Sequence, residues 1–132
     1  MVCMLDTNVC IYVIKRKPIQ VLDKLRTFEP GDVAVSSITV AELQYGACKS
    51  SQPDRNREAL TEFLVPLEVV AFDDSAAVHY GEIRAHLERR GNVIGAMDML
   101  IAAHARSLSL TMVTNNIQEF ERVPGLRVEN WV

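Results

Sequence analysis

The chain has 132 residues, which is close to the usual size of one domain and long enough to bury its own core. Hydrophobic residues make up 48% and charged residues 23%, a composition that excludes disordered, fibrous and membrane-spanning chains. The formal net charge of -3 excludes a general attraction to polyanions, so contact with nucleic acid would need local basic patches or metal ions.

Four short apolar runs, rich in β-branched residues, predict buried strands at residues 2–5, 33–36, 67–70 and 110–113. The tail at residues 127–132 predicts an edge strand, with Trp131 anchoring the end of the chain. Segments of helical periodicity lie between the runs. They begin after Thr7, at Pro18, at Ile38, near Arg55, at Asp74 and near Gly95. Residues 49–57 predict a polar loop between two helices.

This alternation of strands and helices predicts an α/β fold. We expect a single domain over residues 1–132, with a mostly parallel central sheet flanked by helices on both faces. Charged and polar residues interrupt the apolar stretches near the N-terminus, so neither a signal peptide nor a spanning helix is predicted. We therefore expect a cytoplasmic protein without membrane contact. The three cysteines, whose spacing fits neither zinc nor a disulfide framework, are expected to be buried thiols: Cys3, Cys10 and Cys48.

Polar residues follow three of the predicted strands directly, as Asp6-Thr7-Asn8, Ser36-Ser37 and Thr114-Asn115-Asn116. Parallel strands place their ligand site beyond their carboxyl ends, so these residues should meet at one edge of the sheet. Glu42, one helical turn beyond the serines, and Asp98, in the first turn of the helix from Gly95, reach the same edge.

Clustered carboxylates raise one another's pKa or hold a cation, and an all-oxygen ligand set favours Mg²⁺ or Mn²⁺ over zinc. The sequence therefore predicts a metal site formed by Asp6, Glu42 and Asp98. Asn116, whose carbonyl oxygen could coordinate without adding charge, joins these three acids as a candidate catalytic residue. Such a site suits phosphoryl transfer, in which the metal activates a water molecule and neutralises charge on the phosphate. Thr7 and Thr114 are candidates to hold the pocket through their hydroxyls.

Each acid also has a purely structural explanation. Asp6 could cap the helix that follows it, and Glu42 fits a capping box with Thr39. Asp98 near a helix N-terminus is favoured by the helix dipole whatever its function. One metal site is the more economical explanation of three acids at three strand ends. Packing or surface roles are expected for the histidines, which show no metal-ligand pattern: His79, His86 and His104.

Four stretches of the chain carry a resemblance to a known family: residues 4–8, 37–43, 94–102 and 113–116, the last followed by Glu119 and Phe120. In this order and spacing they resemble the PIN-domain toxins of the VapC group in bacterial type II toxin-antitoxin systems. The resemblance implies an endoribonuclease dependent on Mg²⁺ or Mn²⁺ that cleaves structured RNA and so inhibits translation. The favoured substrate is a transfer RNA cut at the anticodon loop, the initiator transfer RNA being one candidate.

The resemblance also implies a homodimer and a cognate VapB-type antitoxin, through which alone the toxin would reach operator DNA. The family's catalytic acids carry over to Asp6, Glu42 and Asp98. A fourth acid that is common in the family corresponds to Asn116, and this departure lowers the negative charge of the site.

Seven basic residues are candidates for phosphate contacts: Lys15, Arg16, Lys17, Arg84, Arg89, Arg90 and Arg106. Ile19, Leu22, Tyr45 and Leu60 are expected mostly in the core, and any that are exposed would form a groove for the antitoxin.

Three other classes of protein could place acids at the strand ends of such a fold. A receiver domain needs paired acids after its first strand, and a haloacid-dehalogenase phosphatase needs an Asp where Asn8 stands, so both fail on detail. A non-catalytic RNA-binding or assembly module with a PIN-like fold remains the alternative, although the presence of all three acids favours catalysis.

Overall fold

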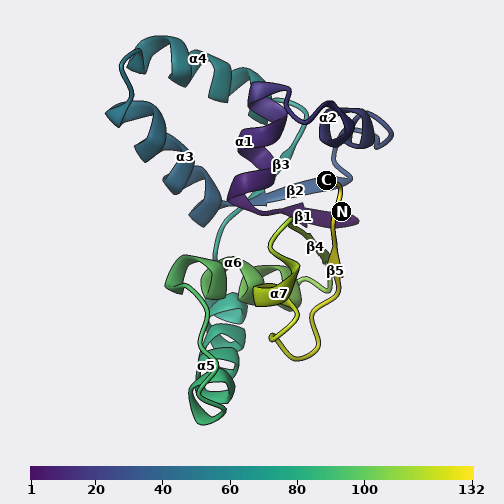
Figure 1. Ribbon diagram of the computed structural model, residues 1–132, viewed down its shortest axis with the longest axis vertical. Helices are drawn as coiled ribbons and strands as arrows, with labels where there is room; N and C mark the ends of the chain where they lie inside the picture. The colour runs from purple at the N-terminus through teal and green to yellow at the C-terminus, as the bar shows by residue number, and fades with distance from the viewer.

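The computed structural model describes all of residues 1–132, and strands alternate with helices along the chain (Figure 1). The strands are β1 (Cys3–Leu5), β2 (Val33–Ser36), β3 (Glu68–Val70), β4 (Thr111–Val113) and β5 (Val128–Glu129). The helices are α1 (Thr7–Lys15), α2 (Ile19–Leu25), α3 (Ser37–Lys49), α4 (Pro53–Leu64), α5 (Asp74–Arg89), α6 (Ala96–Ser107) and α7 (Ile117–Phe120).

The five strands form one sheet in the order β3-β2-β1-β4-β5, and every neighbouring pair is parallel. The sheet divides the core into two apolar clusters because successive side chains of a strand point to opposite faces. Met4 joins the cluster built with α5 and α6, whereas Cys3 and Leu5 join the cluster built with α1, α2 and α4. Figure 1 shows the same layering, with α1 to α4 above the sheet and α5 and α6 below it. The α/β fold predicted from the sequence is thereby confirmed.

Two predictions about the α3–α4 region were wrong. The polar loop expected at residues 49–57 is shorter, because α3 continues to Lys49 and α4 already begins at Pro53. Proline is well tolerated in the first turn of a helix, where its missing N–H has no partner to lose. Cys48 near the end of α3 is exposed and not buried, unlike Cys3 and Cys10.

The end of the chain follows the prediction in outline. The edge strand β5 covers two residues of the expected tail, and Trp131 is buried and stacks on Phe28 with 5.5 Å between ring centroids. The short helix α7 was not predicted. Ile19 and Tyr45, expected in the core, are 54% and 66% exposed. None of the helices is long and apolar enough to cross a membrane.

Candidate active site

Asp6 lies at the carboxyl end of the central strand β1 and is the N-cap of α1. One carboxylate oxygen accepts a hydrogen bond from the Val9 backbone N–H at 2.8 Å, and the other accepts from the Thr114 hydroxyl at 2.5 Å. The side chain is only 4% exposed, and burial raises its pKa although both hydrogen bonds oppose the shift. Asp6 therefore caps α1, which was the structural alternative to a metal-binding role. Its hydrogen bond to Thr114 also joins the end of β1 to the end of β4.

Glu42 points from α3 toward the start of α1, where its carboxylate accepts a hydrogen bond from the Thr7 hydroxyl at 2.6 Å. The capping box with Thr39 is wrong. Ser36 is the N-cap of α3, its hydroxyl accepts from the Ile38 N–H at 3.1 Å, and the Thr39 hydroxyl is buried without a partner. The carboxylate of Glu42 is thus free of local capping and turned toward the residue next to Asp6.

Asp98 is the third residue of α6, where the helix dipole favours a negative charge. Its carboxylate lies beside Gly95, where a Cβ would be in ordinary van der Waals contact with the nearer oxygen, at 3.5 Å. The pKa of Asp98 is raised to about 6, chiefly by burial, then by hydrogen bonding to Glu119 and by the charges of Glu119, Asp6 and Glu42. Acids from three other parts of the chain therefore lie near enough to Asp98 to disfavour its ionisation.

Glu119 was not among the residues predicted for the site. It lies in α7, and one of its oxygens accepts a hydrogen bond at 2.8 Å from the side-chain amide of Asn116. Asn116 also donates its backbone N–H to the Thr114 hydroxyl at 2.9 Å. The amide at position 116 therefore orients an acid three residues further on, a spacing that brings two side chains to one face of a helix. The spacing of Asn116 and Glu119 is the feature of the sequence from which Glu119 could have been predicted as part of the site.

The four acids have no basic partner. The salt bridges of the structure, Arg57–Asp54, Arg84–Glu88 and Arg106–Glu82, all lie elsewhere. No group of three or more His, Cys, Asp or Glu side chains is arranged to hold a metal ion, and the acids bond to hydroxyls and amides of the protein instead. The donor set nevertheless fits a hard divalent cation, because it contains only oxygens and carries mutual repulsion that such an ion would neutralise.

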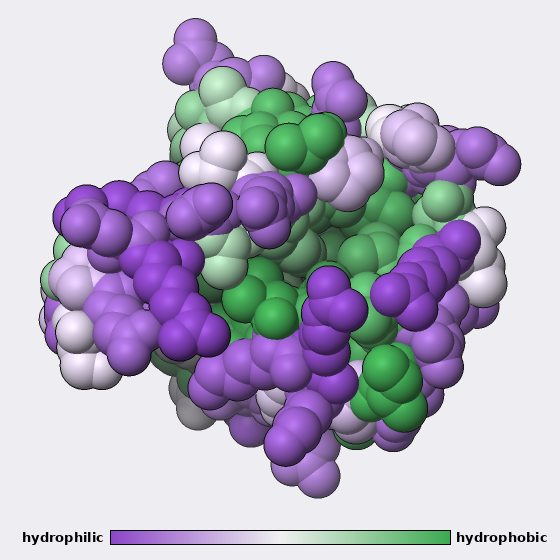
Figure 2. Space-filling model, turned by 90° about the horizontal axis from the view of Figure 1, so that it is seen from above, coloured by the Kyte–Doolittle hydropathy of each residue, from purple (hydrophilic) through white to green (hydrophobic).

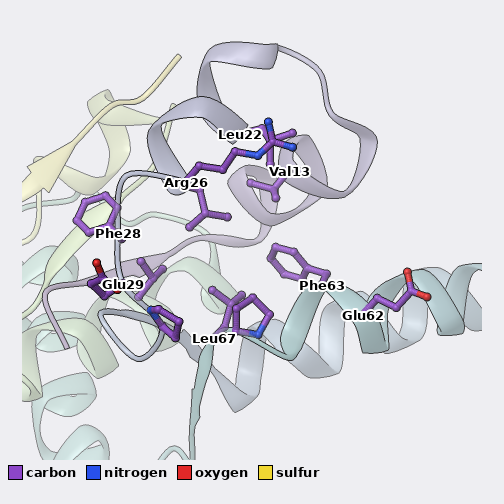
Figure 3. Close-up of a pocket in the computed structure, with 12 residues that line it drawn as sticks. Val13, Leu22, Arg26, Phe28, Glu29, Glu62, Phe63 and Leu67 are labelled. Atoms are coloured by element: carbon purple, nitrogen blue, oxygen red, sulfur yellow. The ribbon is translucent and has the colours of Figure 1, made fainter.

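An apolar trough leads away from these acids. We use this name for the hollow between α1, α2 and α4, lined by Ile11, Val13, Ile14, Leu22, Ala59 and Phe63. Thr7 and Glu42 lie at one end of it, so the trough opens onto the acids. Figure 2 shows apolar side chains lining a hollow that is rimmed by hydrophilic ones. Figure 3 shows its far end, where Val13 and Leu22 face Phe63 and Leu67.

The basic residues divide into two groups. Arg106 is engaged by Glu82, His79 and the Pro124 carbonyl, so its guanidinium is already satisfied. Arg84 bonds to Glu88 and Tyr80 on its own helix. By contrast, exposed basic side chains without ion pairs lie at the end of α1 and just beyond it: Lys15, Arg16 and Lys17.

A parallel α/β sheet with clustered acids at the carboxyl ends of its strands is compatible with a nuclease domain, and comparison with known proteins shows which family it belongs to. The family model described as PIN domain matches residues 3–126. Ribonuclease VapC2 of Haemophilus influenzae is 51% identical over 129 residues, covering 98% of this chain and 97% of the relative. The tRNA(fMet)-specific endonuclease VapC of Shigella flexneri is 48% identical, with 97% and 96% of the two chains covered.

A solved structure, DNA-bound VapBC from Salmonella typhimurium, superposes with a TM-score of 0.94 at 47% identity, and each chain is covered in full. The chain belongs to the PIN-domain family and, within it, to the VapC ribonucleases.

Proposed function

We propose that the chain is the toxin of a type II toxin-antitoxin system, an endoribonuclease that requires Mg²⁺ or Mn²⁺ and cleaves transfer RNA at the anticodon loop. The single observation that supports metal dependence most directly is the group of four acids, Asp6, Glu42, Asp98 and Glu119, with no basic partner. The initiator transfer RNA is the first substrate to test, since a relative with 48% identity is named for it.

The proposed roles follow from the contacts of each side chain. Asp6, Glu42 and Asp98 would hold the ion, which when bound supplies an activated water and neutralises charge on the phosphate. Thr114 and Thr7 fix the carboxylates of Asp6 and Glu42. Asn116 keeps Glu119 turned toward Asp98, so it acts on the site through that neighbour. The exposed bases Lys15, Arg16 and Lys17 would contact phosphates of the RNA.

The test is cleavage of a purified initiator transfer RNA, with elongator transfer RNAs as matched substrates. We expect cleavage with Mg²⁺ or Mn²⁺, its loss on adding a chelator, and its return with excess metal. Asp98→Asn should abolish cleavage while the circular dichroism spectrum is unchanged, because the substitution removes a charge and leaves the side-chain volume. Cleavage that persists in the chelator would refute metal dependence. Metal-dependent RNA binding without any cleavage would favour the non-catalytic module.

We further propose that the trough receives an apolar helix of a VapB-type antitoxin. Apolar side chains predominate in its lining, those that define it are partly exposed except for Val13, and the trough ends at Glu42. A basic side chain of the partner, placed at that end, would pair with the uncompensated acids. Binding of operator DNA would then come from the antitoxin and not from this chain. Inhibition that excess Mg²⁺ leaves unchanged would point to simple steric blockade.

The proposal extends to a homodimer located in the cytoplasm. Val78 on α5 and Val93 and Met97 near the start of α6 are 63%, 47% and 46% exposed, which is costly for a monomer in water. Sedimentation of the purified chain should give twice the monomer mass. Substitution of Val78 by a charged residue should reduce the measured mass toward that of the monomer.

A further inference from the structure

Ser36 and Ser37, at the end of β2, are among the polar residues that the sequence predicts at the edge of the sheet. The proposed metal site does not include them. Ser36 is fully buried, and its hydroxyl lies 2.8 Å from Nδ1 of His104, which is 1% exposed. His104 belongs to α6, so this buried hydrogen bond joins residues 68 positions apart in the sequence. Ser36 is at the same time the N-cap of α3. One hydroxyl therefore connects the start of α3 with the body of α6.

The neighbouring contacts hold this junction in place. The Ser37 hydroxyl accepts a hydrogen bond at 3.0 Å from the Phe72 N–H, in the segment between β3 and α5. The Phe72 ring in turn packs edge-on against the His104 ring, with 5.5 Å between centroids. The imidazole is thus held from two sides, by Ser36 through a hydrogen bond and by Phe72 through van der Waals contact. This leaves little freedom for its position.

The two helices joined here are the ones that carry Glu42 and Asp98. Glu42 lies six residues beyond Ser36, and Asp98 lies six residues before His104. Six residues of helix span about 9 Å, so each acid is at the end of a rigid arm of that length measured from the junction. A tilt of about 5° at the junction would move the far end of an arm by about 0.8 Å. Metal ligands tolerate deviations of only about 0.2 Å.

We infer that Ser36 and His104 are positioning residues, whose hydrogen bond sets the separation of Glu42 and Asp98 and thereby the affinity of the site for a divalent cation. This inference rests on the proposed metal dependence. Neither residue contacts the acids, so their effect is transmitted by the helices. Loss of the bond should leave the fold in place and weaken the binding of metal.

The experiment compares substitutions that break the bond with matched controls that do not. Ser36→Ala removes the hydroxyl, and Thr39→Val is its control, because Thr39 is equally buried in the first turn of α3 and its hydroxyl has no partner. His104→Leu keeps the bulk of the ring without a polar atom, whereas His104→Asn gives up bulk and keeps an atom able to bond to Ser36. The readouts are the rise in melting temperature on titration with Mg²⁺ and the Mg²⁺ concentration for half-maximal cleavage of RNA.

We expect Ser36→Ala and His104→Leu to need roughly three to ten times more Mg²⁺ in both measurements, at or below the range seen when a direct partner of a metal ligand is lost. The Mg²⁺ concentrations that Thr39→Val and His104→Asn require should stay within about twofold of the wild-type value. Equal Mg²⁺ dependence of Ser36→Ala and Thr39→Val would overturn the inference, even if Ser36→Ala melts at a lower temperature. If Ser36→Ala fails to fold, the comparison of the two His104 variants decides in the same way.

The outcome also separates this inference from the proposal on which it rests. A wild-type protein whose melting temperature and cleavage do not respond to Mg²⁺ or Mn²⁺ would refute the metal site, and the inference with it. A wild-type protein that responds, with all variants alike, would refute only the positioning role of Ser36 and His104.

Discussion

Thr114→Val tests how the most buried acid is held. The Thr114 side chain is fully buried, donates to Asp6 at 2.5 Å and accepts from the Asn116 N–H at 2.9 Å. Valine has almost the same shape, so the substitution removes two hydrogen bonds and creates no cavity. A bond to a charged group contributes about 1.5–3 kcal/mol and a neutral one about 0.5–1.5 kcal/mol, so we expect a loss of roughly 3 kcal/mol.

This loss can be expressed as a change in melting temperature. An unfolding entropy of about 2.1 cal/mol/K per residue over this chain converts roughly 3 kcal/mol into about 10 °C. Thr114→Ser is the control, since it keeps the hydroxyl and gives up one methyl group, at a cost of about 1 kcal/mol. Both variants would be melted beside the wild type in the presence of a chelator, and their cleavage of RNA would be titrated with Mg²⁺.

The same substitution should raise the Mg²⁺ requirement, because Asp6 would lose the contact that fixes its second oxygen. If Thr114→Val melted within about 2 °C of Thr114→Ser, the hydroxyl would not hold the buried carboxylate, and the account of Asp6 given above would be refuted.

Three further predictions concern the rest of the molecule. Glu119→Gln should raise the Mg²⁺ concentration for half-maximal cleavage roughly tenfold. Asn116→Asp exchanges the hydrogen bond to Glu119 for an additional negative charge, and we expect the charge to outweigh the lost bond and to lower that Mg²⁺ concentration; identical titration curves would place both residues outside the site. Burial lowers the pKa of His104 below its ordinary value of 6.5. The folded protein therefore keeps this histidine neutral at a pH where the unfolded chain binds a proton, and the free energy of unfolding falls as the pH drops below 6.5. Denaturant titrations from neutral to mildly acidic pH should show a smaller decline in the free energy of unfolding for His104→Asn than for the wild type. Equal declines in the two proteins would contradict this prediction. Phe63→Asp should weaken capture of a co-expressed antitoxin while cleavage of RNA by the free toxin is unchanged, and undiminished capture would exclude this end of the trough.

The strands and the positions of Asp6 and Asp98 were predictable because they follow from strong local signals. Apolar runs such as residues 2–5 and 110–113 have few alternatives to a buried strand, and the strand-end rule then places Asp6 without knowledge of its neighbours. Asp98 follows from the strong helical pattern that begins after Gly95. In each case the local sequence and the global fold favour the same arrangement.

The failures share a different cause, which is dependence on tertiary contacts. Helix α7 is a single turn and too short to show periodicity, so the sequence pattern does not place Glu119 in the site. The spacing of Thr39 and Glu42 fits a capping box, but a sequence pattern does not reveal that Ser36 caps the helix and that Glu42 meets Thr7 from another part of the chain. The role expected for the carbonyl oxygen of Asn116 stays a prediction, but the hydrogen bond from its amide nitrogen to Glu119 was not foreseen.

The unequal burial of the three cysteines has a practical consequence for spectroscopy. Burial raises the pKa of Cys3 to about 11 and that of Cys10 well above its ordinary value, so neither thiol should react with a maleimide at neutral pH. Cys48 is exposed and follows Ala47, which lines the end of the trough nearest the acids. The native sequence therefore offers one position for a fluorophore, whose emission would report the arrival of a partner helix without any engineered cysteine.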